Sequence, residues 1–122
     1  MYKRQLLENV KKDYAGAEEA YRTAIRLDPE DTKAHNNLGV LLEDVQEDYA
    51  GAEQAYRTAI RLGDGVAHNN LGTLLEEAKK DYAGAEQEYR TAIRLDPENE
   101  LAHRNLAGLL KDNREREVGP GL

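Results

Sequence analysis

The fifteen residues 13–27, DYAGAEEAYRTAIRL, occur three times in this chain and decide its fold. They recur at 48–62 and at 81–95, and thirteen of the fifteen positions are identical in all three copies. The two variable positions are those of Glu19 and Ala20. Internal repetition of this kind predicts a stack of similar structural units rather than one continuous globular core.

A second block, AHNNLG at 34–39, alternates with the first and gives the same period. It recurs at 67–72 and, less closely, at 102–107, so that successive copies of either block are 33 or 35 residues apart. A period near 34 is typical of helical repeats in which each unit buries its apolar face against the next one.

Each unit reads as two amphipathic helices, with no segment that reads as a strand. In the first helix the apolar residues follow the i, i+3, i+4, i+7 spacing of one helix face; they are Leu38, Leu41, Leu42 and Val45. In the second helix the apolar face consists of Tyr49, Ala52, Tyr56, Ala59 and Ile60. An aspartate precedes each second helix as its expected N-cap; these are Asp13, Asp48 and Asp81.

Composition excludes several classes of function. The 122 residues carry a net charge of −7, whereas binding to a nucleic-acid backbone or an anionic membrane surface needs a basic face. The chain has no Cys and no Ser, which excludes a disulfide framework and a Ser or Cys nucleophile. The sequence has no apolar run long enough to span a bilayer and no secretory h-region at its start. We expect a cytoplasmic protein that is not an enzyme.

These residues resemble the tetratricopeptide repeat. That family's pattern is a bulky residue, a Leu-Gly pair, a second bulky residue, an alanine, an aromatic residue, an alanine and a proline. One unit fills it with His35, Leu38, Gly39, Leu42, Ala52, Tyr56 and Ala59. The next unit fills it with His68, Leu71, Gly72, Leu75, Ala85, Tyr89, Ala92 and Pro97. The sequence departs from the pattern in a longer turn between the two helices and in a short middle linker without proline.

The resemblance implies an all-α, helix-turn-helix repeat solenoid with seven antiparallel helices in a right-handed superhelix. We expect one array over residues 1–117, followed by a disordered tail at 118–122. The expected units are approximately 1–31, 32–64 and 65–99, with a terminal helix at 101–116. The chain begins inside a first helix, whose apolar residues Leu6, Leu7 and Val10 lack a full unit around them.

Three histidines occupy equivalent places in successive units, at His35, His68 and His103. Equivalent places in stacked helices are about 10 Å apart, whereas zinc ligands all lie ~2.1 Å from one ion. The sequence therefore predicts roles in helix packing for these residues, with no metal and no cofactor.

In a tetratricopeptide array the first helices line a concave groove, so the residues beside their apolar stripes are the candidate binding residues. They form a row of asparagines, a central row and an acidic edge: Asn37, Asn70 and Asn105; Val40 and Thr73; Asp44, Glu77 and Asp112. Glu43 and Glu76 are expected to reinforce the acidic edge. The asparagines match the placement of the asparagine ladder in the superhelix of the O-GlcNAc transferase. That resemblance implies a grip on a peptide backbone.

The expected partner is a protein or peptide, with a preference for a basic extended segment that complements the acidic edge. Some tetratricopeptide modules bind acidic chaperone C-termini through a basic clamp, but the matching positions here hold no cation. Two hypotheses follow from the sequence. The first is a module that binds an extended peptide; the second is a structural scaffold, natural or designed, that self-associates through the ends of the array.

Overall fold

The computed structural model describes the backbone of residues 2–118 and the side chains of residues 9, 11 and 13–117. The side chains of Leu6, Leu7 and Val10, which were predicted to be partly bare, lie outside this description. The tail predicted at 118–122 also lies outside it, except that Val118 is the last residue of a helix.

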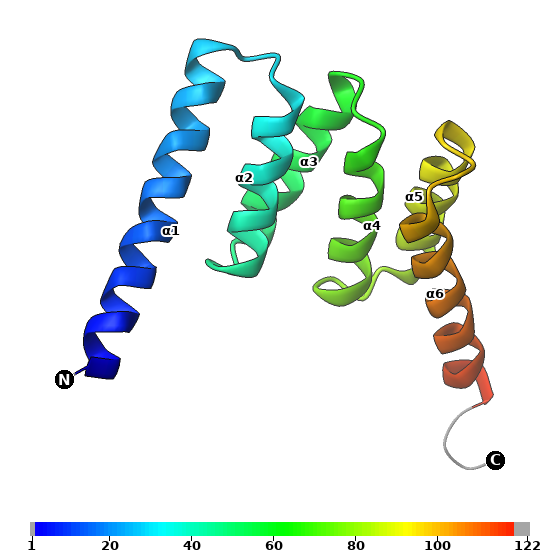
Figure 1. The fold of residues 1–122 in the computed structure, drawn as a ribbon. Helices are drawn as coiled ribbons and strands as arrows, with labels where there is room; N and C mark the ends of the chain where they lie inside the picture. The colour runs from blue at the N-terminus through cyan, green and yellow to red at the C-terminus, as the bar shows by residue number, and fades with distance from the viewer. Residues whose placement is uncertain (1, 119–122) are drawn as a thin grey trace. The chain divides into compact units, whose positions relative to one another are not determined.

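Within residues 2–118 the regular secondary structure is helical throughout, as the periodicity predicts. In this described part of the chain six helices follow one another (Figure 1). Their bounds are α1 (Tyr2–Leu27), α2 (Thr32–Asp44), α3 (Tyr49–Arg61), α4 (Val66–Glu77), α5 (Tyr82–Leu95) and α6 (Glu100–Val118).

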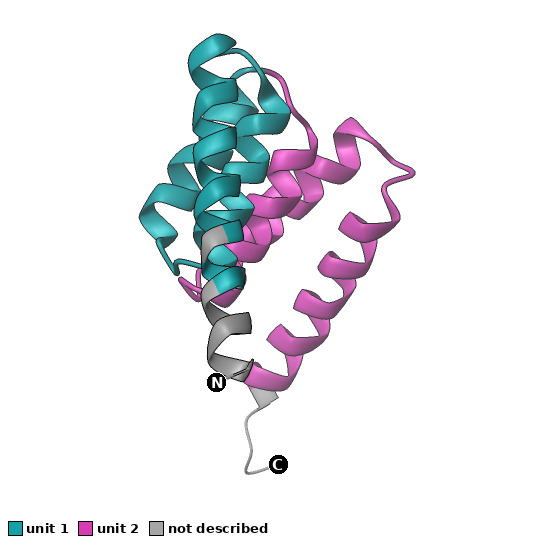
Figure 2. Ribbon diagram, turned by 60° about the vertical axis from the view of Figure 1, so that its left-hand side comes forward, with its two compact units in different colours: residues 1–62 teal, residues 63–122 magenta. Residues whose placement is uncertain are grey.

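The chain forms two compact units, residues 1–62 and residues 63–122 (Figure 2). In the first unit α2 packs against both α1 and α3, and in the second α5 packs against both α4 and α6. The boundary falls at Gly63, which has a φ of +101°. Only glycine adopts that left-handed conformation without a steric penalty, so Gly63 suits the turn that follows α3.

The core of each unit is a helical hairpin closed by a glycine and a tyrosine. Gly39 of α2 faces the ring of Tyr56 on α3, and Gly72 of α4 faces the ring of Tyr89 on α5. Tyr56 and Tyr89 are only 1% and 0% exposed. The leucine stripes of α2 and α4 are buried around them, at Leu38, Leu41, Leu42, Leu71, Leu74 and Leu75.

The turn inside each hairpin is held by an aspartate, as predicted. Asp48 Oδ1 accepts a hydrogen bond from the Gly51 backbone N–H at 3.0 Å, and Asp81 caps α5 in the same way. The residues before these caps, Glu47 and Lys80, have φ values of 51° and 57°. An L-residue in this region costs about 1–2 kcal/mol, so packing within the hairpin has to compensate for the strain.

The prediction of seven helices is wrong, because the two helices expected at the start of the chain are one continuous helix, α1. Asp13 therefore lies inside a helix and is not an N-cap. The sequence explains the difference: Lys3 and Arg4 stand where the other units have their Leu-Gly pair. At Gly39 and Gly72 a Cβ would lie 2.5 Å from the tyrosine ring, so the sequence at the start of α1 does not favour the close contact that compensates for the strained turn in the other units.

Candidate functional site

The candidate site begins on α2, where three predicted residues share one exposed face. Asn37, Val40 and Asp44 are spaced i, i+3 and i+7, which places them on the same side of the helix. All three are exposed, Val40 at 38%, while the neighbouring Leu38 and Leu41 are buried. The face beside the packed stripe is therefore available to a partner.

The equivalent residues on α4 are less accessible. Asn70 and Thr73 are half-buried, and Glu77 is exposed. The Thr73 hydroxyl donates a 2.8 Å hydrogen bond to the Asn70 carbonyl oxygen of its own helix. The hydroxyl proton is therefore used within α4, and Thr73 offers a partner its methyl group and the acceptor lone pairs of its oxygen.

On α6 the predicted asparagine is part of a contact between two helices. Asn105 is half-buried, and its Nδ2 donates a 3.0 Å hydrogen bond to Oδ1 of Asn69 on α4. Asn69 itself is only 3% exposed. A buried amide needs such a partner, because an unsatisfied polar group in the interior costs about 1–3 kcal/mol. One amide hydrogen of Asn105 is therefore committed to helix packing.

The first asparagine of each pair, Asn36 and Asn69, was not among the predicted site residues, and the structure buries both side chains. A signal was present in the repeats. Both residues are asparagine in the units of α2 and α4, whereas α6 has Arg104 at the equivalent position, and Arg104 is exposed. A polar residue that changes to a long cation in one copy indicates that its surroundings differ between copies.

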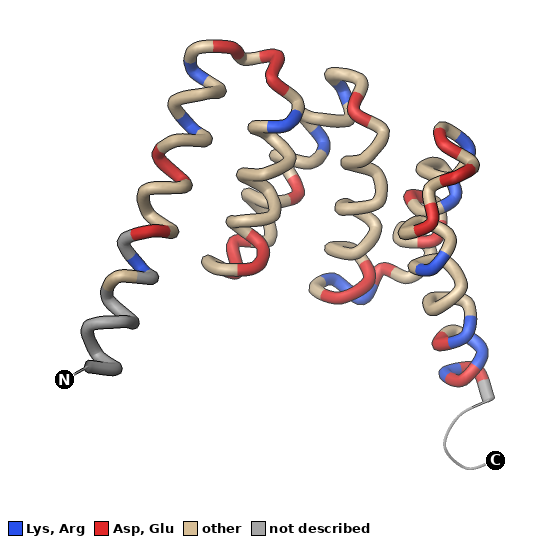
Figure 3. The backbone as a smooth tube through the Cα atoms, viewed as in Figure 1, with Lys and Arg blue, Asp and Glu red and all other residues tan. Residues whose placement is uncertain are grey.

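The acidic residues lie at the C-terminal ends of α2 and α4, beyond a long stretch without charge (Figure 3). Glu43 and Glu76 do not simply reinforce this edge, since each accepts a 2.8 Å hydrogen bond from a core tyrosine hydroxyl, Tyr56 and Tyr89 respectively. Asp44 and Glu77 are exposed and Asp112 is half-buried, so these three residues carry the accessible part of the acidic edge.

Burial and the neighbouring Glu43 carboxylate raise the pKa of Tyr56 well above its usual value. A raised pKa in the folded state means that the contribution to stability is complete below the unfolded-state pKa of ~10 and is lost as the pH rises above it. We predict that Tyr56 alone accounts for about 1.4 kcal/mol of lost stability at pH 11. Urea unfolding followed by circular dichroism from pH 8 to pH 11 measures this loss. The Tyr56→Phe variant should lose that much less over the same range, and equal losses in both proteins would contradict the assignment.

The sequence matches the tetratricopeptide repeat family twice, over residues 11–67 and over residues 45–100. These overlapping matches cover most of the chain, including both hairpins. The chain belongs to the tetratricopeptide repeat family. None of the curated proteins matches its sequence.

Solved structures share this tetratricopeptide fold at low sequence identity. One is the first TPR of Spaghetti (RPAP3) bound to the HSP90 peptide SRMEEVD, with 18% identity and a TM-score of 0.75 over 93% of this chain and 90% of that one. Another is the CopN–Scc3 complex, with 23% identity and a TM-score of 0.65 over 93% of this chain and 66% of that one. At these identities the likeness shows the fold.

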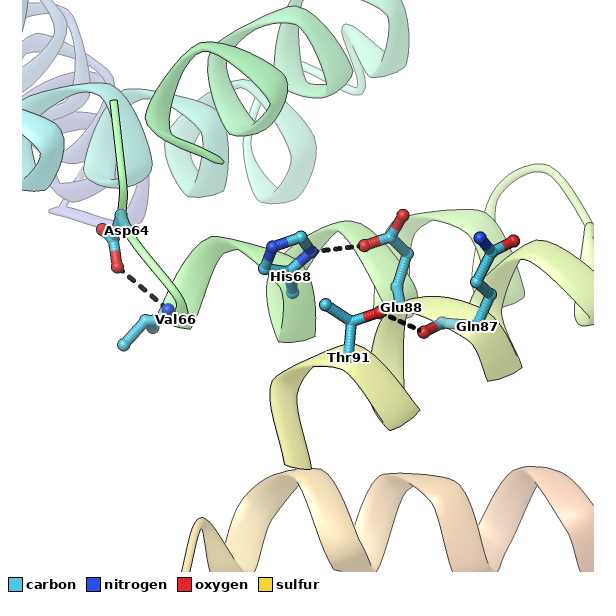
Figure 4. Close-up of polar contacts among 6 residues, drawn as sticks. All are labelled: Asp64, Val66, His68, Gln87, Glu88 and Thr91. Carbon is cyan, nitrogen blue, oxygen red and sulfur yellow. Dashed lines mark hydrogen bonds and ion pairs between the residues drawn. The ribbon is translucent and has the colours of Figure 1, made fainter. Parts of the chain in front are cut away.

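The three histidines of the tetratricopeptide units each make a local contact. Nε2 of His35 lies 3.0 Å from the Pro29 carbonyl oxygen, and Nε2 of His103 lies 2.8 Å from that of Pro97. His68 has Leu62, and not a proline, six residues before it, and its Nδ1 lies 2.6 Å from Oε2 of Glu88 on α5 (Figure 4). Among the residues whose side chains are described, no three His, Cys, Asp or Glu residues are grouped as metal ligands would be.

The first unit contains a cavity of about 350 Å³ between α1, α2 and α3. Its lining includes Arg22 and Ile25 of α1 and His35, Leu38 and Leu42 of α2. None of the predicted binding residues lines it. No helix in the described part of the chain is long and apolar enough to cross a membrane.

Proposed function

We propose that this tetratricopeptide protein is a protein-interaction module that binds an extended, basic peptide segment. The observation that carries the proposal is the exposed face of α2, where Asn37, Val40 and Asp44 stand beside a buried leucine stripe. The same i, i+3, i+7 positions on α4 and α6 are exposed or half-buried. Each first helix thus offers an amide, a small or apolar position and an acidic residue.

The asparagines suit a peptide backbone because a primary amide has both donors and an acceptor. One side chain can therefore satisfy the N–H and C=O groups of one extended residue without contacting its side chain. Asn37 and Asn70 carry this role in the proposal. Asn105 contributes its carbonyl oxygen and its second amide hydrogen, since the first is donated to Asn69.

The charge of the acidic edge determines which peptides we expect the module to prefer. The HSP90 peptide in the Spaghetti complex, SRMEEVD, is acidic at its C-terminal end. Asp44, Glu77 and Asp112 would repel such a peptide and attract one with Lys or Arg at the same places. Interactions between exposed charges act mainly on the rate of encounter and weaken with salt.

A matched pair of peptides tests this preference. Fluorescein-labelled SRMEEVD is compared by anisotropy with SRMKKVK, which differs only in its acidic positions. We expect the basic peptide to bind at least about tenfold more tightly at low salt, which corresponds to ~1.4 kcal/mol, with the difference shrinking as salt is added. Equal binding, or preference for the acidic peptide, would contradict the acidic edge.

The asparagines are tested with the double variant Asn37→Ala/Asn70→Ala. We expect it to lose most of the affinity for the basic peptide while helicity is unchanged. The control is Gln54→Ala/Gln87→Ala, which removes two exposed amides from the second helices instead. If the asparagine variant binds normally, or if its melting temperature falls by several degrees, the ladder hypothesis is wrong. Absence of any peptide binding, together with sedimentation as a multimer, would favour the scaffold function.

A further inference from the structure

Helix α1 has the sequence of a second helix, but among the side chains that the structure describes its residues are less buried than their equivalents in α3. In α3 the buried residues are Ala52, Ala55, Tyr56 and Ala59, and Tyr56 contacts the first helix at Gly39 and Glu43. In α1 the equivalent residues are half-buried or exposed: Ala17, Ala20, Tyr21 and Ala24. We call these four residues the open face of α1.

The two hairpins show what binds a face that agrees with the open face at three or more of its four residues, the exception being Glu88 of α5 at the place of Ala20. Each is covered by a helix with the sequence Leu-Gly-x-Leu-Leu-Glu, at residues 38–43 in α2 and 71–76 in α4. The glycine lets the tyrosine ring approach, because a Cβ there would lie 2.5 Å from the ring. The glutamate, four residues later, accepts the tyrosine hydroxyl at 2.8 Å. These two features supply the shape and the polar partner for one tyrosine.

We propose that the open face of α1 binds, from another molecule, an amphipathic helix that carries Leu-Gly-x-Leu-Leu-Glu. Tyr21 is the anchor, its ring lying on the partner's glycine and its hydroxyl donating to the partner's glutamate. Because α1 agrees with α3 and α5 at Ala17, Tyr21 and Ala24, the geometry of the two hairpins transfers directly. This surface is separate from the peptide-binding face of α2.

The partner helix is not α6 of a second copy, although α6 is also a first helix. Ala107 stands in α6 where α2 has Gly39, so its Cβ would meet the tyrosine ring. Lys111 stands where α2 has Glu43, so the hydroxyl loses its carboxylate acceptor. Both residues that recognise the tyrosine in the hairpins are therefore replaced in α6.

The probe is a fluorescein-labelled peptide of residues 31–47, DTKAHNNLGVLLEDVQE, titrated with the full chain and followed by anisotropy. Such a short helix is only marginally stable by itself, so docking has to supply the energy of ordering it. We expect saturable binding, weakened at least about tenfold by Tyr21→Ala in the chain, as for a central aromatic anchor. Glu19→Gln, on an exposed position outside the open face, should leave the affinity unchanged.

The decisive control is in the peptide, so that it does not depend on the folding of a variant chain. Alanine favours helix over glycine by about 1 kcal/mol, so binding that depended on helicity alone would be tighter for a Gly39→Ala peptide. Docking on Tyr21 predicts the opposite, an affinity loss of about tenfold or more, because the added methyl group meets the ring. Equal or tighter binding of the alanine peptide would overturn the proposal. So would a failure to bind, or binding that Tyr21→Ala does not weaken.

Discussion

Replacing Tyr56 or Tyr89 with alanine should lower the free energy of unfolding by about 3–5 kcal/mol, as is usual for a large aromatic residue lost from a core. Both rings are at most 1% exposed, both lie against a glycine, and both hydroxyls donate to a glutamate. The substitution leaves a cavity and removes the glutamate's hydrogen-bond donor. Urea unfolding followed by circular dichroism measures the loss.

Tyr21 has the same sequence context but should respond differently. It is half-buried on α1, so Tyr21→Ala should cost less than about 1 kcal/mol, in the range of partly exposed sites. Alanine also has a higher helix propensity than tyrosine, which further reduces the expected loss of stability. A loss as large as that of Tyr56→Ala would mean that the start of the chain folds back over Tyr21 in solution, which would restore the seven-helix architecture.

The comparison of Tyr21 with Tyr56 shows what the repeat pattern predicts and what it does not. The period, the leucine stripes and the Asp48 and Asp81 caps correctly predict an all-helical tetratricopeptide fold, because each depends on residues close in sequence. The continuity of α1 does not follow from such local residues. In the other units the two helices are held together by a contact between residues far apart in sequence, the glycine of the first helix and the tyrosine of the second. The sequence signal for the continuous α1 is that Lys3 and Arg4 replace the Leu-Gly pair 18 and 17 residues before Tyr21, since the local signals of α1 and α3 are the same.

The candidate site was harder to predict for a related reason. The exposure of Asn37 and Asp44 follows from helix periodicity, which places them beside the buried stripe. The bond from Asn105 to Asn69 connects helices 36 residues apart in sequence, and periodicity within one helix says nothing of it. A first helix in a stack contacts more than one neighbour, so its buried face is wider than a single stripe.

The glycines of the Leu-Gly pairs should be the positions most sensitive to a single added methyl group. Two effects compete when a helical glycine becomes alanine. Alanine stabilises the helix by about 1 kcal/mol, while overpacking a tight contact costs about 1–3 kcal/mol. At Gly39 and Gly72 the added Cβ would lie 2.5 Å from the tyrosine ring. The ring is fully buried and has little room to move, so overpacking wins and a net loss of stability is expected.

Gly108 is the matched control, because it lies within a helix and a Cβ there meets nothing within 4 Å. Gly108→Ala should therefore raise the free energy of unfolding, by up to about 1 kcal/mol, from helix propensity alone. The same glycine-to-alanine change should therefore shift the urea midpoint in opposite directions. Gly39→Ala and Gly72→Ala should lower it, and Gly108→Ala should raise it. If all three variants were stabilised, the rings of Tyr56 and Tyr89 would have to yield to a methyl group, and the close approach of glycine to tyrosine would not be what closes the hairpins.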